Sequence, residues 1–360
     1  MNQPVSIQGY FSSIQRFLMS LVNPHLLLSL ACTLLATYSA ASVKTTNQLT
    51  PITMCVFDII GKNGPTHNIM NEYRVSAMKW GVELTFKSYT NDRIAAEDFN
   101  AGVCDMVNLP GIRARNYNHF TGSLNSIGAI PSYQHLTLIL STLSSPKAAK
   151  YMRQGDYEIV SIAPTGALFG FVIDRSINTP EKLAGKKITV LDSAPESEYL
   201  IQQTGMTPVS STITNALQKF NSHAVDITGA PAIAYEPMEL YKGLEPNGGI
   251  IDWPLHQSTV QLVIRWKKFP DGFGQHSRTH SREFNNLFMD IITTSEANIP
   301  EKYWIKIPQQ VKAAWNDTHR KNRLALRDQG IYNAKALTLF RKVRCKIDPT
   351  LSECTSDNKE

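Results

Sequence analysis

The stretch CVFDIIGKNGPTHN, residues 55–68, sets the pattern of the chain: a short apolar strand runs into a loop with two glycines, and a helix begins after it. The pattern then repeats, because VELTFKSY (82–89), a short helix over 94–100 and VCDMVNL (103–109) follow in order. This alternation predicts a doubly wound parallel α/β sheet. Ligands of such sheets bind beyond the carboxyl ends of the strands, so the loops Gly61–Gly64 and Asn108–Gly111 are expected at that edge.

A glycine loop between a strand and a helix can cradle a phosphate, but this loop lacks the Walker pattern. Asn63 stands after Gly61-Lys62, where a Ser or Thr would bind magnesium. The chain also has no GxGxxG, GxSxG or HExxH motif. His276 and His280 have the spacing of a metal pair but lack a nearby carboxylate. The sequence therefore predicts no enzyme, no cofactor and no metal site.

Composition excludes several classes of protein. The chain has 360 residues, 42% of them hydrophobic and 18% charged, with a formal charge of +6, which is typical of a globular protein with a sizeable core. Two basic runs, His319–Arg323 and Arg341–Arg344, have no aromatic residues interleaved with the charges. They are interpreted as solvated helix faces, and no nucleic-acid partner is expected.

The N-terminus predicts export. The run HLLLSLACTLLATYSAA (25–41) is apolar and ends in small residues, with Ser39 and Ala41 suited to a signal-peptidase site. We therefore expect a signal peptide over 1–41, a mature protein that begins near Ser42, and a periplasmic location. A single membrane anchor is the alternative, although the apolar run is short for a span. Translation could start at Met1 or at Met19.

Removal of that segment would leave four cysteines, an even number that favours pairing in an exported chain. Cys345 and Cys354 bracket the proline-containing tail CKIDPTLSEC, and we predict a disulfide between them. Cys55 and Cys104 each begin an apolar strand. They could bridge neighbouring strands or remain buried thiols, and the sequence leaves both possibilities open.

A second unit follows LFGFVIDR (168–175) and looks like a reduced copy of the first. KKITVLDS (186–193) and AVDITGAP (224–231) end as strands at loops, with a helix over 197–205 between them. Past TVQLVIRW (259–266) the chain is mostly helical. We predict a first lobe over 42–173 plus 259–360 and a second lobe over 174–258, joined by a hinge.

Several motifs together resemble a known family. TPEKLAGKKI (179–188), GMTPV (205–209), ALQ (216–218) and IPQQV (307–311) occur in the order seen in DctP-type substrate-binding proteins of TRAP transporters. The chain also resembles the group of solute-binding proteins that includes AdeT, a name attached to RND-type efflux and aminoglycoside resistance. With one apolar segment it cannot itself be a polytopic pump.

The resemblance implies two α/β lobes that close on a small-molecule solute in the periplasm and deliver it to a membrane transporter component, TRAP-type or RND-type. The alternative function is an accessory role in RND-type drug efflux. By the same resemblance, the Gly61–Pro65 loop corresponds to the first ligand-side loop, where glycines let backbone N–H groups approach an anion. A plain turn is the other interpretation.

One departure from the family concerns the ligand. Thr189 stands where the family pattern carries an arginine that grips a solute carboxylate. Arg113 and Arg115 are candidate replacements; otherwise the ligand is not a simple carboxylate. We expect weak binding of small dicarboxylates and a gain on Thr189→Arg. The predicted ligand-binding residues are Asn63, Asn108, Arg113, Arg115, Thr189, Ser193, Thr228, Tyr235 and His256, with Tyr235 also open to interpretation as a core residue.

Overall fold

The computed structural model describes residues 48–355 and residue 360. The predicted signal peptide lies outside the described residues. Within residues 48–355, no helix combines the length and apolar character needed to cross a membrane.

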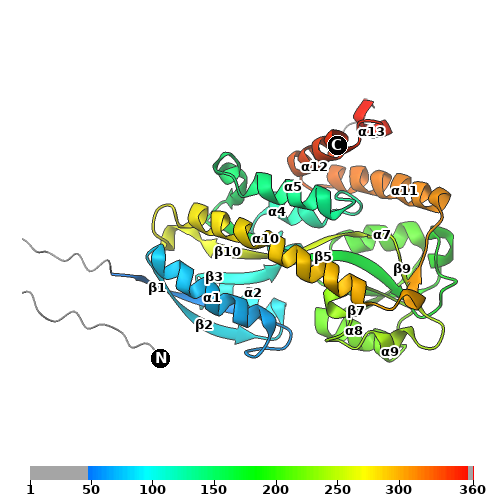
Figure 1. Cartoon of the computed structure of the whole chain (residues 1–360), viewed down its shortest axis with the longest axis horizontal. Coiled ribbons are helices and arrows are strands. Elements are labelled where there is room, and N and C mark those ends of the chain that lie inside the picture. Colours follow the sequence, from blue (N-terminus) through cyan, green and yellow to red (C-terminus); the bar gives the residue numbers. More distant parts are fainter. Residues whose placement is uncertain (1–47, 356–359) are drawn as a thin grey trace, which may run out of the picture. The chain divides into compact units, whose positions relative to one another are not determined.

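The first strands form the predicted alternation of strands and helices (Figure 1). β1 pairs in parallel with β2 on one side and with β3 on the other. The elements are β1 (Thr50–Phe57), α1 (Pro65–Lys79), β2 (Val82–Tyr89), α2 (Asp92–Asn100) and β3 (Met106–Pro110).

The second unit repeats this topology. β6 pairs in parallel with β7 and β8, so the order β7-β6-β8 matches the order β2-β1-β3. Gly205 ends α7 in the left-handed conformation, as its place in the sequence predicts. The elements are β6 (Lys187–Leu191), α7 (Glu196–Thr204), β7 (Thr207–Ser211), α8 (Ile213–Asn221) and β8 (Ile227–Pro231).

Parallel pairing is confirmed within the first unit, whereas two long strands that join the units make the whole sheet mixed. β10 (His256–Arg265) runs antiparallel to β3 and to β5 (Tyr157–Val172). β5 pairs with β10 along its first part and with β8 along its last five residues, so the main path is β2-β1-β3-β10-β5-β8-β6-β7. We call the β1–β3 side the first lobe and the β6–β8 side the second lobe.

The C-terminal elements pack against both lobes. α10 (Phe273–Asn298) runs along β5 (Figure 1). Next, β11 (Trp304–Ile305) pairs in parallel with β9 (Gly249–Ile251), a strand that lies beside the end of β5. α11, α12 and α13 follow over Gln309–Asp328, Ala334–Ile347 and Ser352–Thr355. The predicted lobe boundaries remain a proposal.

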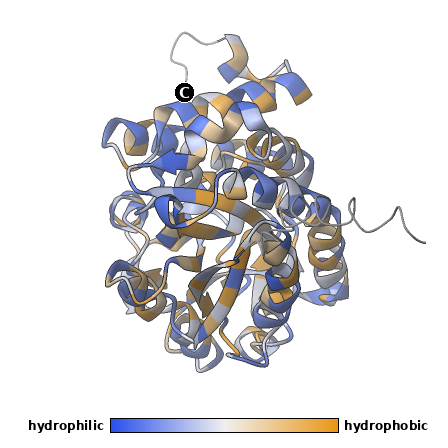
Figure 2. Ribbon diagram, turned by 90° about the vertical axis from the view of Figure 1, so that its left-hand side faces the viewer, coloured by the Kyte–Doolittle hydropathy of each residue, from blue (hydrophilic) through white to orange (hydrophobic). Residues whose placement is uncertain are grey.

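Hydrophobic residues gather along the central strands, while the outer helices carry many hydrophilic residues (Figure 2). Buried side chains of β1 divide between the two faces of the sheet: Cys55 and Phe57 pack on one face, and Met54 and Val56 on the other. This alternation is the expected period of two for a strand buried on both faces.

Both cysteine pairs form disulfides. The predicted Cys345–Cys354 bridge is confirmed and ties α13 to α12. Cys55–Cys104, which the sequence left open, is also paired. It joins β1 to the segment that leads into β3, where neighbouring parallel strands bring the two Cα atoms to 5.7 Å.

Candidate functional site between the lobes

The turn after β3 carries two buried arginines. β3 ends at Pro110, and the short helix α3 (Gly111–Ala114) follows it. Arg113 and Arg115 are each 8% exposed. Position 111 has no room for a side chain, because a Cβ atom there would lie 2.4 Å from Asn125 Oδ1. The turn therefore holds both guanidinium groups inside the protein.

Arg113 joins carboxylates from both lobes. Its Nε donates to Asp92 at the start of α2, and its Nη2 donates to Asp192 Oδ1 at 2.6 Å. Asp192 is the first residue after β6. Burial alone would lower the pKa of Arg113, but hydrogen bonds and charge from Asp92 and Asp192 raise it above its ordinary value. This arginine is therefore charged and paired across the lobes.

Arg115 makes a two-pronged pair with the second lobe. Its Nη1 and Nη2 donate to Glu196 Oε2 and Oε1 at 2.6 and 3.0 Å. Glu196, the first residue of α7, is 6% exposed. Burial opposes the charge of Arg115, but the bonds to Glu196 outweigh it and raise the pKa. This planar geometry is the one by which arginine binds a ligand carboxylate.

His256 begins β10 beside this pair. Its Nδ1 lies 3.1 Å from the Gln257 carbonyl oxygen, and the charges of Glu196 and Arg115 both act on the ring. Burial is the main reason that the pKa of His256 is lowered. We call Arg113, Arg115, Asp192, Glu196 and His256 the interlobe site.

Two buried acceptors lie next to the interlobe site. Asn125 is 3% exposed and Gln257 is 1% exposed. Asn125 Nδ2 donates to the Gln257 carbonyl at 3.2 Å. Among the described residues, neither Asn125 Oδ1 nor Gln257 Oε1 has a hydrogen-bond partner. Buried oxygens of this kind are usually satisfied, so these two suit an external donor.

In the Gly61–Gly64 loop, the backbone N–H groups that could bind an anion are bound by the Asp58 side chain. Asp58 Oδ2 accepts the backbone N–H groups of Thr66 and His67 at 2.8 and 3.2 Å, and Asp58 Oδ1 accepts that of Ile60. A Cβ at Gly64 would lie 2.0 Å from this carboxylate. The loop is therefore a turn capped by Asp58, and the predicted ligand residue Asn63 is exposed on it.

Three predicted residues bond within the sheet. Asn108 bonds through its side chain to both the N–H and the C=O of Phe57, at 2.8 Å each, and so fixes the end of β1. Thr189 and Thr228 share a hydrogen bond of 2.8 Å between their hydroxyls, across β6 and β8. These contacts leave less of each side chain for a solute than the sequence suggested.

Ser193 and Tyr235 differ in their surroundings. Ser193 follows Asp192 directly, and its buried hydroxyl has no partner among the described residues. Tyr235 is 3% exposed in the core of the second lobe, with its ring against Tyr241 and Tyr303. The structure thus gives Tyr235 a packing role, and we leave it out of the proposed site.

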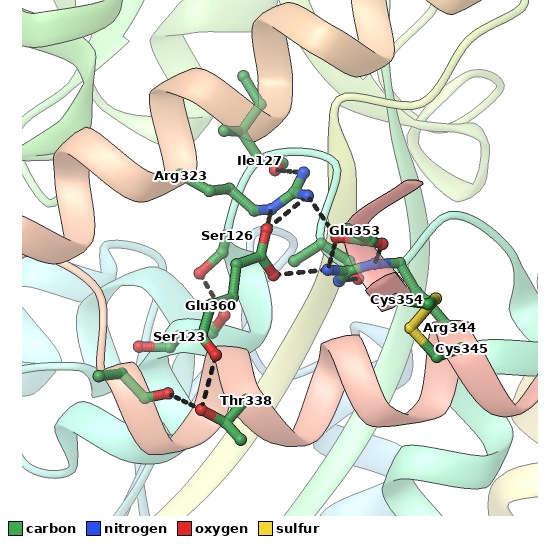
Figure 3. Close-up of polar contacts among 12 residues, drawn as sticks. Ser123, Ser126, Ile127, Arg323, Thr338, Arg344, Cys345, Glu353, Cys354 and Glu360 are labelled. Atoms are coloured by element: carbon green, nitrogen blue, oxygen red, sulfur yellow. Dashed lines mark hydrogen bonds and ion pairs between the residues drawn. A yellow bond between two sulfur atoms is a disulfide. The ribbon is translucent and has the colours of Figure 1, made fainter. Parts of the chain in front are cut away.

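Four buried charged side chains form a cluster among α11, α12, α13 and the last residue, Glu360 (Figure 3). Arg344 donates to both oxygens of Glu353, at 2.5 and 2.7 Å, and to Glu360 Oε2 at 2.5 Å. Arg323 donates to Glu360 Oε1 at 2.7 Å. Burial would raise the pKa of Glu353, but Arg344 outweighs burial and holds this pKa below its ordinary value. Two arginines and two glutamates balance each other's charge.

This cluster holds the loop beside the interlobe site. Arg323 and Arg344 donate to the carbonyls of Ile127 and Ala129, at 3.1 and 2.6 Å (Figure 3 shows Ile127). Between them, the Gly128 N–H donates to the carbonyl of Leu255, the residue before His256. Gly128 has φ +59°, and a Cβ there would lie 2.7 Å from His319 Nδ1.

The prediction that the basic runs are solvated helix faces is wrong for His319, Arg323 and Arg344, which are buried. His319 is 1% exposed, and Arg323 and Arg344 are 3% exposed. Arg323 and Arg344 look exposed in sequence because their acidic partners, Glu360 and Glu353, lie 37 and 9 residues further along the chain. Among the described residues, neither ring nitrogen of His319 has a hydrogen-bond partner.

Buried His319 is expected to make stability fall at acidic pH. Burial, with the charge of Arg323 and the nearby His256, lowers the pKa of His319 from 6.5 to about 3. A folded pKa below the unfolded one gives stability that is present above pH ~6.5 and is lost as the pH falls toward the folded value. We expect His319 to contribute a loss of about 2 kcal/mol between pH 7 and pH 5.

Urea unfolding at a series of pH values measures this, with His319→Gln as the comparison. The wild-type protein should lose about 2 kcal/mol more than His319→Gln over that interval, while His256 titrates in both. Equal pH slopes for the two proteins would contradict the prediction.

Sequence reasoning named the arginines but missed their partners. Asp192 and Glu196 were not predicted, although LDSAPESE (191–198) places them directly after a strand end. That position, at the carboxyl edge of a parallel strand, was the available signal.

We also searched the described residues for metal-binding groups and surface hollows. The described residues contain no group of three or more His, Cys, Asp or Glu side chains suited to a metal ion. A surface hollow of about 340 Å³ is lined by residues such as Phe120, Lys150 and Lys335, and another lies along α7 beside Val190. None of the predicted ligand residues lines either hollow.

Comparisons with known proteins agree with this architecture. The family model for solute-binding protein AdeT 1/2 matches residues 68–359. Probable solute-binding protein AdeT1 of Acinetobacter baumannii is 41% identical over 304 residues, covering 84% of this chain and 100% of that protein. Probable solute-binding protein AdeT2 of the same organism is 28% identical over 65% of this chain and 98% of its own length.

Solved structures share the fold at low sequence identity. A TRAP periplasmic solute-binding protein from Desulfovibrio salexigens has a TM-score of 0.67 at 12% identity, covering 83% of this chain and 99% of that one. Another, from Rhodoferax ferrireducens, has a TM-score of 0.65 at 14% identity, covering 83% and 100%. These likenesses confirm a two-lobed α/β fold, and with the family match they show that the chain belongs to the AdeT 1/2 solute-binding protein family.

Proposed function

We propose that this protein captures a small solute between its two lobes at the interlobe site and delivers it to a TRAP-type membrane transporter in the periplasm. One observation carries the proposal. Side chains at the carboxyl ends of β3 and β6 meet across the two lobes through Arg113–Asp192 and Arg115–Glu196. The carboxyl ends of parallel strands are where ligands of such sheets bind.

The connections between the lobes suit hinge closure. The crossing strands β5 and β10 continue the sheet from one lobe into the other. Small changes in these strands would change the separation of the two loop sets, as in hinge closure of other two-lobed proteins. The ion pairs that join the lobes would then break and re-form as solute enters and leaves.

The comparisons support solute capture more than an accessory role in drug efflux. The related structures carry orotic acid in the Desulfovibrio protein, malonate in the Rhodoferax protein and β-D-galacturonate in a protein from Sulfitobacter. Each of these is described as a TRAP periplasmic protein. A TRAP-type partner and the exported location are proposed from this likeness and from the predicted signal peptide.

A thermal-shift screen of organic acids, amines and sugars tests solute binding. A solute at 100 times its Kd should stabilise the protein by about 2.7 kcal/mol. The site variant is Arg115→Met/Glu196→Leu, which removes both buried charges together and leaves neither unpaired. Arg93→Met, at an exposed pair on α2, is the matched control. Stabilisation should disappear in the site variant and persist in the control; stabilisation that persists in both would refute this site.

Thr189→Arg should raise the affinity for a C4 dicarboxylate at least tenfold. The new guanidinium would offer a charge-assisted hydrogen bond, worth about 1.5–3 kcal/mol, where threonine now bonds only to Thr228. Titration calorimetry with succinate measures the change, with Thr189→Met as the control for side-chain length. Equal succinate affinities in wild type and Thr189→Arg would show that position 189 does not contact the solute.

A further inference from the structure

The two arginines of the interlobe site are already bound by carboxylates of the chain. Arg115 binds both oxygens of Glu196, and Arg113 binds Asp92 and Asp192. With Asp92 counted beside the interlobe site, these five groups carry two positive and three negative charges, a formal net charge of −1. The same chain also places Asp58 at the start of α1, where an anion would otherwise bind.

A solute carboxylate would therefore meet an unfavourable site. To reach Arg115 it must displace Glu196, whose side chain is 8% exposed. A buried carboxylate that loses its arginine is strongly destabilised or must take up a proton. A carboxylate that leaves the pairs intact instead approaches the Asp192 carboxylate, whose side chain is 40% exposed, so both routes disfavour an organic acid.

The polar groups beside the ion pairs that lack a partner are hydrogen-bond acceptors. Asn125 Oδ1 and Gln257 Oε1 are buried oxygens without partners, and Asn125 Oδ1 lies against Gly111 of the arginine turn. Arg113 binds only one oxygen of Asp192, and the Asp192 side chain is 40% exposed. These acceptors match the N–H groups of an amine better than the oxygens of an acid.

Resting on the proposed function, we propose that Asp192 and Glu196 determine the specificity of the site by taking the place of a solute carboxylate. The solute is accordingly an organic cation that bears N–H donors. Its ammonium group lies against Asp192, and its other donors reach Asn125 and Gln257.

Calorimetric titration with two probes of matched length and opposite charge tests this inference. Succinate is the anionic probe and 1,4-diaminobutane is the cationic one. The site variant is Asp192→Asn/Glu196→Gln, which keeps the shape of both side chains, removes both charges and leaves Arg115 one acceptor oxygen in place of two. Glu198→Gln, two residues further along α7 and exposed, is the matched control.

The wild type and Glu198→Gln should bind 1,4-diaminobutane at least tenfold more tightly than succinate. The double variant should lose at least tenfold for the diamine and gain at least tenfold for succinate. If the double variant does not fold, Asp192→Asn alone carries the test, because Asp192 is partly exposed and Arg113 keeps Asp92.

Tighter binding of succinate than of the diamine by the wild type, or no gain for succinate in the variants, would overturn the inference and leave solute binding intact. A folded wild-type protein that binds neither probe nor any solute of the screen would instead overturn the proposed function, and the inference with it.

Discussion

Replacing Arg344 with methionine is expected to lower the free energy of unfolding by about 3–5 kcal/mol. Arg344 is 3% exposed and pairs with both Glu353 and Glu360. Without it, Glu353 would lose both of its hydrogen bonds to Arg344, and its approach to Arg323 is longer, at 3.8 Å. A buried charge without a close partner is far more costly than an exposed one.

Urea unfolding measures the loss, and two further variants test its cause. Arg344→Met/Glu353→Leu removes both members of the pair and leaves Arg323–Glu360 in place, so it should recover most of the stability. Lys267→Met breaks an exposed pair with Asp156 and should cost less than about 1 kcal/mol. If the double variant is as unstable as Arg344→Met, the loss does not come from the unpaired glutamate.

Removing the Cys55–Cys104 disulfide is expected to cost about 4 kcal/mol. The bridge joins residues 49 apart in sequence, and the chain-entropy model assigns larger effects to longer loops. Cys345–Cys354 joins residues only 9 apart, for which the same model gives about 2.5 kcal/mol. The two bridges should therefore differ in their contribution.

The matched variants are Cys55→Ala/Cys104→Ala and Cys345→Ala/Cys354→Ala, compared by urea unfolding under oxidising conditions. The first pair should be the less stable, with the lower urea midpoint. The reverse order would show that local packing around the cysteines, and not loop closure, sets the contribution of each bridge.

Local patterns in the sequence predicted the elements and their order well. The strand at Cys55, the turn at Gly61–Gly64 and the helix end at Gly205 follow from hydrophobic runs and glycine placement, which depend on near neighbours. The Cys345–Cys354 pair could be predicted for the same reason. Cys55–Cys104 stayed open because a bridge between strands depends on register, which no short segment specifies.

Local patterns in the sequence could not predict the antiparallel strands at the centre of the sheet. β5 changes partners from β10 to β8 near Leu168, so one strand belongs to both lobes. Its hydrophobic run predicts burial but not direction, because parallel and antiparallel strands can carry the same run when both faces are covered.

The interlobe site was half predictable. Arg113 and Arg115 could be named from their place after β3, whereas Asp192 and Glu196 lie 79 and 81 residues from them. His319 has the same difficulty, because a basic helix turn looks solvated until its distant neighbours are known. Tyr235 could be a ligand or a core residue by position, and only the packing of the second lobe separates the two.

The most direct test of solute capture between the lobes is a crystal structure with the solute that stabilises the protein most in the thermal-shift screen. Solute capture between the lobes predicts electron density for that solute between the Gly111–Arg115 turn and the Asp192–Glu196 segment, within hydrogen-bonding distance of at least one residue of the interlobe site. Density for the solute elsewhere on the protein, with Arg113–Asp192 and Arg115–Glu196 intact and no solute beside them, would contradict it.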